Sequence, residues 1–171
     1  MLTTKQILKL SPSLKSGDVL HCTSNGVLAR LIQKFTKSKI NHTALIIEVW
    51  DSLFIADSQK DGTNLRPFEE WVKKYNYVYE ISRPKQFPTT LRERAMSKIG
   101  HTPYDLKSLF ITQPIYQLTG KWVGRPEEKA DTKMYCSEYV SWVFSLEEWW
   151  KNSPQKVYEI MNISEDFLTI Q

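Results

Sequence analysis

Apolar residues recur every three or four positions in several parts of the chain, which is the spacing of one face of a helix. This pattern predicts a short amphipathic helix over residues 28–35 and another over residues 91–99. Gly100 follows the second pattern and is typical of the position just past a helix end. Pro67 favours the start of a further helix, because proline is tolerated in a first helical turn. The chain is therefore partly helical.

Runs of β-branched residues predict strands between these helices. A turn at residues 16–17 leads into a first strand, and residues 40–49 indicate a longer strand that is buried on both faces. Residues 53–57 form a hairpin partner for it, with turn residues at 51–52. Residues 77–81 indicate one more strand. The chain thus mixes short strands with short helices.

Three segments carry weaker patterns. Residues 113–132 lack periodicity and contain prolines and glycines, so we expect a long loop, and loops of that length often shape a site. The N-terminus is a short polar segment, and the residues after 153 predict no particular element.

Composition indicates an ordinary globular protein. The chain has 171 residues, of which 41% are hydrophobic and 25% charged, so we expect one domain over residues 1–171. The net charge is +4 and the basic residues are scattered, which argues against nucleic-acid binding but suits an anionic partner. Neither a signal peptide nor a transmembrane segment is recognisable, so we expect a cytoplasmic protein. The sequence does not determine the oligomeric state.

The chain has two cysteines, Cys22 and Cys136. This number excludes a disulfide framework and favours a reducing environment. The cysteines and the three histidines show none of the paired spacings of zinc sites, so we expect neither a metal nor a cofactor. Cys22 lies in the first predicted strand, and we expect it in the core.

Cys136 stands in the first turn of a helical pattern over residues 135–143. Unpaired N–H groups and the positive end of the helix dipole stabilise a thiolate there, and the thiolate is the nucleophilic form. Cys136 also shares a helix face with apolar neighbours, as a buried structural cysteine would. The position alone leaves both interpretations open.

Six short motifs occur in an order that is more informative than any one of them. They are Gly-Asp-Val at 17–19, Asn-His-Thr-Ala at 41–44, Ala-Asp-Ser at 56–58, Leu-Arg-Pro-Phe at 65–68, Gly-His-Thr-Pro-Tyr-Asp at 100–105 and Tyr-Cys-Ser-Glu at 135–138. In this order they resemble the circularly permuted NlpC-like papain-fold cysteine amidases and peptidases of the YiiX and YaeF type, over residues 14–145. The resemblance implies an α+β fold, permuted papain-like, in which a helix carrying Cys136 packs against a small antiparallel sheet or partial barrel carrying His42.

The same resemblance implies a catalytic triad. Cys136 would be the nucleophile and His42 its base, while Asp57 would orient the imidazole at a position where the family usually has Glu. The order of histidine before cysteine is no obstacle, because catalytic groups are defined by geometry and role.

Strand pairing leaves the third triad member open. A hairpin that turns at residues 51–52 puts Asp57 on the same face as His42 but about four residues, or roughly 13 Å, too far along. The same register puts Asp61 opposite His42, which makes Asp61 the alternative and Gln59 a weaker one. A turn one residue earlier, or a bulge, would bring Asp57 closer.

Three further residues are candidates for the surroundings of the thiol. The backbone N–H of Cys136 or Ser137 would donate to an oxyanion, because both stand at the helix start. Tyr104 and Tyr135 are candidates for lining the site, and packing is an equally good explanation for Tyr104.

The resemblance implies a cysteine hydrolase that cleaves the amide bond of a cell-wall peptide, an N-acyl amino acid or a similar small amide. Two alternatives stay open. One is a lipid acyltransferase, thioesterase or esterase on the same fold, similar to lecithin retinol acyltransferase, with a lipid site near residues 109–111 and Trp122. The other is a catalytically inactive module that binds a peptide or protein. The expected partner is thus a small peptide, amide or lipid-like substrate.

Overall fold

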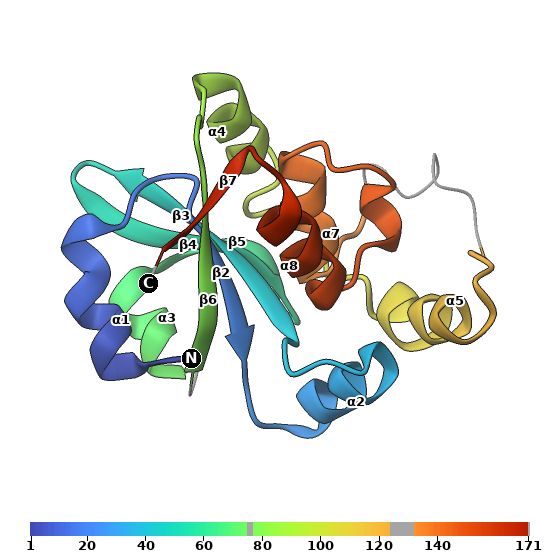
Figure 1. The fold of residues 1–171 in the computed structure, drawn as a ribbon. Helices are drawn as coiled ribbons and strands as arrows, with labels where there is room; N and C mark the ends of the chain where they lie inside the picture. Colours follow the sequence, from blue (N-terminus) through green and yellow to red (C-terminus); the bar gives the residue numbers. More distant parts are fainter. Residues whose placement is uncertain (75–76, 124–131, 171) are drawn as a thin grey trace.

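The structure is a computed structural model that describes residues 1–74, 77–123 and 132–170 (Figure 1). An antiparallel sheet runs through its centre, with strand order β1-β6-β2-β3-β4-β5 and with β7 paired to β6. The strands are β1 (Leu2–Thr3), β2 (Val19–Thr23), β3 (His42–Val49), β4 (Ser52–Gln59), β5 (Gly62–Pro67), β6 (Tyr77–Pro84) and β7 (Phe167–Ile170). The predicted mixture of strands and helices is confirmed as a small α+β fold.

Helices flank both faces of this sheet (Figure 1). They are α1 (Thr4–Leu10), α2 (Val27–Thr36), α3 (Phe68–Lys74), α4 (Thr89–Met96), α5 (Gln113–Thr119), α7 (Cys136–Val143) and α8 (Pro154–Ile163). Shorter helical turns are η1 (Ser11–Ser13), η2 (Ser108–Thr112) and η3 (Trp149–Lys151).

Strand alternation divides the core between the two faces. Even-numbered residues of β3, such as Ala44 and Ile46, pack with Ile7 of α1 and Trp71 of α3. The odd-numbered residues pack on the other side, where Leu45 contacts the cluster that contains Val140 of α7. Both faces of β3 are therefore buried, as its continuous apolar sequence predicts.

The β3–β4 hairpin turns one residue earlier than the sequence predicts. Val49 pairs with Ser52, so the turn residues are Trp50 and Asp51, and both have positive φ angles of 46° and 61°. Two-residue turns of this kind match the twist of the flanking strands. The predicted turn at 51–52 is wrong because Trp50, whose side chain is 95% exposed, takes up the left-handed conformation. The register of the whole hairpin follows from this turn.

Several elements were not apparent in the sequence. The predicted loop over 113–132 is wrong at its start, because residues 113–119 form α5. Its proline lies in the first turn, where a missing N–H costs no helical hydrogen bond, and Gly120 ends the helix at a φ of 69°. Residues 124–131 of that predicted loop lie outside the described residues.

The two chain ends also form elements that the sequence did not predict. A capping box between Thr3 and Gln6 begins α1 in the segment that appeared merely polar. Ser153 begins α8, because its side chain accepts a hydrogen bond from the N–H of Lys156 at 3.2 Å. Helix α4, by contrast, is shorter than the predicted 91–99 helix at its C-terminal end, and Gly100 follows in a turn with a φ of 83°.

Candidate active site

Helix α7 begins at Cys136, which confirms a helix with this cysteine in its first turn. The preceding residue, Tyr135, has an extended backbone, and its N–H donates to the carboxylate of Glu138 at 3.1 Å. Glu138 therefore satisfies a backbone donor that would otherwise lack a partner at the helix start. The thiol itself is buried, since Cys136 is 1% exposed.

Strand β4 fixes the segment that leads into this helix. The hydroxyl of Ser58 donates to the carbonyl oxygen of Met134 at 2.6 Å, and both residues are buried. Ser58 directly follows Asp57 in the strand. One short stretch of β4 thus carries both the hydroxyl that binds the segment before Cys136 and the carboxylate of Asp57.

His42 is the first residue of β3, and its Nε2 lies 2.9 Å from Oδ2 of Asp57. The β3–β4 ladder pairs Leu45 with Ala56, so its continuation puts Asp57 two residues from the partner of His42 instead of four. The two side chains lie on the same face and meet diagonally. The earlier turn at Trp50 therefore brings this pair within hydrogen-bonding distance.

The other ring nitrogen of His42 is available to Cys136. Nε2 is engaged by Asp57, and Cys136 lies close enough to His42 to raise the pKa of the imidazole. His42 begins a strand and Cys136 begins a helix, so the two meet at the end of the sheet. The structure thus brings together Cys136, His42 and Asp57.

The carboxylate of Asp57 is held by three donors besides His42. Trp71 Nε1 and Gln59 Nε2 each donate to Oδ2 at 2.7 Å, and Arg66 Nη1 donates to Oδ1 at 2.6 Å. Burial raises the pKa of Asp57, but the hydrogen bond with His42 and the charges of His42 and Arg66 outweigh burial and lower it. Asp57 is therefore an ionised carboxylate with a fixed orientation.

The charge state of His42 follows from its two partners. Burial lowers the pKa of a histidine, whereas the charge of the Cys136 thiolate and the hydrogen bonds with Asp57 and Cys136 raise it. The raising effects prevail, and the pKa of His42 is about 10. At neutral pH the imidazole is consequently protonated between two acceptors.

The alternatives for the orienting residue lie elsewhere. Asp61 pairs with Arg66 Nη2 at 2.5 Å, and its side chain is 68% exposed. Gln59 reaches Asp57 and not the imidazole. The sequence did not indicate that Arg66 and Trp71 belong to the site, although Arg66 stands in one of the six motifs. A buried carboxylate needs such donors, but the sequence does not show which side chains supply them.

The three predicted neighbours of the thiol have different surroundings. Tyr104 lines the pocket beside His42, and burial raises the pKa of its hydroxyl well above the ordinary value. Tyr135 points elsewhere: its hydroxyl accepts from Gln113 at 2.5 Å in a separate apolar cluster. The hydroxyl of Ser137 is buried and has no hydrogen-bond partner within the described part of the chain.

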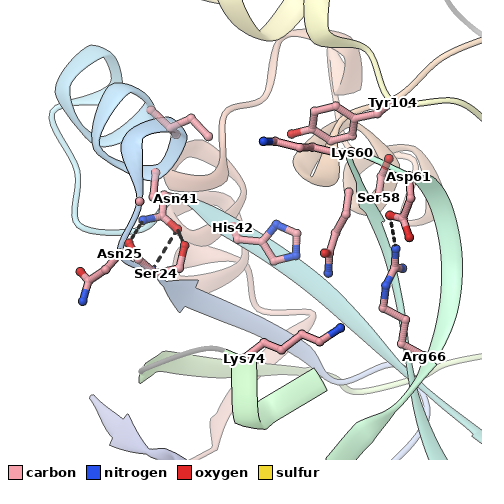
Figure 2. Close-up of a pocket in the computed structure, with 14 residues that line it drawn as sticks. Ser24, Asn25, Asn41, His42, Ser58, Lys60, Asp61, Arg66, Lys74 and Tyr104 are labelled. Carbon is pink, nitrogen blue, oxygen red and sulfur yellow. Dashed lines mark hydrogen bonds and ion pairs between the residues drawn. The ribbon is translucent and has the colours of Figure 1, made fainter. Parts of the chain in front are cut away.

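A polar pocket of about 450 Å³ opens beside His42 (Figure 2). One wall comes from the loop after β2 and from helix α2, and the other from the end of β4, the following turn and α3. The lining residues are Ser24, Asn25, Gly26, Ala29, Ile32, Asn41, His42, Ser58, Gln59, Lys60, Asp61, Arg66, Lys74 and Tyr104. Cys136 is not among these lining residues, and it is 1% exposed.

The described residues include no group of three or more His, Cys, Asp and Glu side chains that is arranged to hold a metal ion. The Asp57 carboxylate is already engaged by Arg66, Trp71, Gln59 and His42, so this donor set does not fit a cation. Across the same residues, no helix is both long enough and apolar enough to cross a membrane.

Comparison with solved structures finds a similar fold. The crystal structure of the metalloprotein YiiX from Escherichia coli O157:H7, DUF1105, matches with a TM-score of 0.55 and 17% sequence identity. The match covers 92% of this chain and 96% of that chain. No protein-family model and no curated protein matches the sequence. At this identity the likeness concerns the fold alone.

Proposed function

We propose that this protein is a cysteine hydrolase that cleaves an amide bond through an acyl-thioenzyme. The observation that carries the proposal is one buried imidazole, His42, that is hydrogen-bonded to a carboxylate and whose pKa is raised by Cys136 at a helix N-terminus. Thiol, imidazole and carboxylate in this order are the groups that nucleophilic acyl transfer requires.

Each residue has a defined role in the reaction. The Cys136 thiolate attacks the carbonyl carbon, which forms a C–S bond and moves the π electrons onto oxygen. Backbone N–H groups of Cys136 and Ser137 donate to that oxyanion. The His42 imidazolium protonates the departing nitrogen as the C–N bond breaks. His42 then takes a proton from water, which attacks the thioester and releases a carboxylic acid and the thiolate.

Asp57 orients the imidazole and stabilises its protonated form. It is shorter by one methylene than the Glu usual in the resembling family, yet its carboxylate lies 2.9 Å from His42 Nε2. The diagonal position on the neighbouring strand compensates for the shorter side chain. Asp57 is thus a positioning residue, and proton transfer stays with His42.

The fold is consistent with a permuted papain-like arrangement. A helix beginning at the cysteine packs on strands β3 and β4, and the histidine stands at the start of β3, upstream of the cysteine in the chain. The similarity to the YiiX structure extends over almost the whole chain and supports the same arrangement.

Lipid acyl transfer on this fold receives less support. The apolar hollow beside Leu109 and Phe110 has a volume of only about 20 Å³, which is room for roughly one water molecule. The larger pocket at His42 is lined mainly by polar side chains. These observations favour a small amide over a long acyl chain.

The test is a panel of acyl p-nitroanilides, peptides and p-nitrophenyl esters assayed with the wild type and with Cys136→Ala and His42→Ala. We expect amide hydrolysis that both substitutions reduce by at least about 10³-fold, and a mass increase on Cys136 equal to the acyl group. Ester turnover with inert amides would favour the esterase alternative. Binding without turnover, with no acylated cysteine, would indicate a binding module and contradict the proposal.

A further inference from the structure

Two lysines face the pocket without a compensating carboxylate. Lys60 lies in the turn between β4 and β5, and Lys74 is the last residue of α3. Figure 2 shows their ammonium ends directed into the hollow on opposite sides of His42. Within the described ranges neither lysine forms an ion pair.

The guanidinium that lines the pocket is already paired with carboxylates. Arg66 donates to Asp57 at 2.6 Å and to Asp61 at 2.5 Å, and the second contact also occupies the acidic side chain that lines the pocket. The opposite wall is uncharged and carries Ser24 and Asn25. The unpaired ammonium groups of Lys60 and Lys74 therefore give this pocket an excess of positive charge.

We infer that Lys60 and Lys74 select a substrate that carries a free carboxylate close to the amide bond placed at His42. The inference rests on the proposed function and narrows its substrate class to a peptide or acylated amino acid with a free carboxylate. Two ammonium groups that line one pocket attract an anion that enters it, and either one can pair with a carboxylate beside the imidazole. The polar wall suits the amide groups of such a substrate.

This arrangement makes the two lysines specificity determinants. They pair with the charge of the substrate and not with the bond that breaks, so their loss weakens binding of anionic substrates more than binding of neutral ones. A neutral amide has no carboxylate for the two ammonium groups to attract.

The first test compares the alkylation of Cys136 by iodoacetate and by iodoacetamide, in a Cys22→Ser background. We expect Lys60→Gln/Lys74→Gln to lower the iodoacetate-to-iodoacetamide rate ratio by roughly three- to tenfold. The matched control is Lys73→Gln/Lys85→Gln, which removes the same charge from exposed lysines outside the pocket lining. The control should change the ratio by less than about twofold, because exposed charges that do not line the pocket are screened by salt.

The second test measures binding directly. Acetyl-Ala-Ala, its C-terminal amide and inorganic phosphate are titrated into the Cys136→Ser protein and followed by NMR chemical shifts. We expect the acid to bind at least about threefold more tightly than the amide, and the preference to disappear in the double lysine variant. Equal binding of acid and amide would overturn the inference, and so would binding of phosphate in preference to the acid.

The outcomes separate this inference from the proposed function. His42-dependent alkylation with an unchanged reagent ratio and no preference for the acid refutes the carboxylate site alone. An inert Cys136 refutes the proposed function, whereas lysine-dependent binding of the acid would still establish the carboxylate site.

Discussion

Two buried histidines on neighbouring strands have opposite charge states. In the β2–β3 ladder His21 pairs with Thr43, and His42 pairs with Cys22. Their exposed fractions are 0% and 7%, yet the pKa of His21 is about 3 and that of His42 about 10. Burial alone does not decide the charge of a histidine in this protein.

The difference lies in the partners on the two faces of the sheet. The Nε2 of His21 lies 2.9 Å from the hydroxyl of Ser82 in β6, and its ring meets that of Tyr158 in α8 edge-on at 5.2 Å. A hydroxyl and a ring offer no negative charge, so burial dominates and lowers the pKa of His21. His42 has the Asp57 carboxylate and the Cys136 side chain instead, and both raise its pKa.

The largest effect is expected from Asp57→Asn, which would make the surroundings of His42 resemble those of His21. The change removes the charge that pairs with His42 and with Arg66, and an amide cannot accept from four donors. We expect the free energy of unfolding at pH 7 to fall by about 3–5 kcal/mol, measured by urea denaturation. A loss below about 1 kcal/mol would show that the carboxylate network is not formed.

A smaller effect concerns His21 and pH. The folded-state pKa of His21 lies below its unfolded value of 6.5, so its contribution to stability is present above pH 6.5 and is lost as pH falls toward 3. Between pH 7.5 and pH 5 this loss amounts to about 2 kcal/mol, at roughly 1.4 kcal/mol per pH unit. We expect the free energy of unfolding of His21→Gln to fall by about 2 kcal/mol less than that of the wild type over this pH range. Equal pH dependence in both proteins would contradict the assignment of a neutral His21.

The smallest effect is expected from Asp61→Asn, which is the matched control for Asp57→Asn on the same guanidinium. The Asp61 carboxylate is largely exposed, and exposed ion pairs contribute about 0–1 kcal/mol. Stability should change by less than about 1 kcal/mol, and the alkylation rate of Cys136 by less than about twofold. If Asp61→Asn slowed the alkylation of Cys136 as much as Asp57→Asn does, Asp61 would be the residue that orients His42.

The sequence predicted the elements that carry the candidate site residues better than it predicted the register in which those elements pair. The helix that begins at Cys136 and the strand that begins at His42 follow from local patterns, namely helical spacing and β-branched residues. The hairpin register did not, because it depends on whether Trp50 accepts a positive φ, and the energies of alternative turns differ little. One residue in that turn decides whether Asp57 reaches the imidazole.

Contacts between residues far apart in the chain could not be predicted from the sequence. Trp71 packs in the core, and its indole N–H also donates to Asp57. Helix α5 was missed because its first turn contains a proline and its apolar face is short. Such features depend on which surfaces the fold brings together, and local propensity carries no information about that.

The most direct test of the account is the alkylation of Cys136 as a function of pH, in the Cys22→Ser protein with and without His42→Ala. Cys22 is removed so that a single thiol reacts, although burial already raises its pKa well above the ordinary value. If the His42 imidazolium stabilises the thiolate, alkylation below pH 7 will be at least about tenfold faster with His42 than without it, and the difference will vanish near pH 10. Equal rates with and without His42 across this range would contradict the thiolate–imidazolium pair.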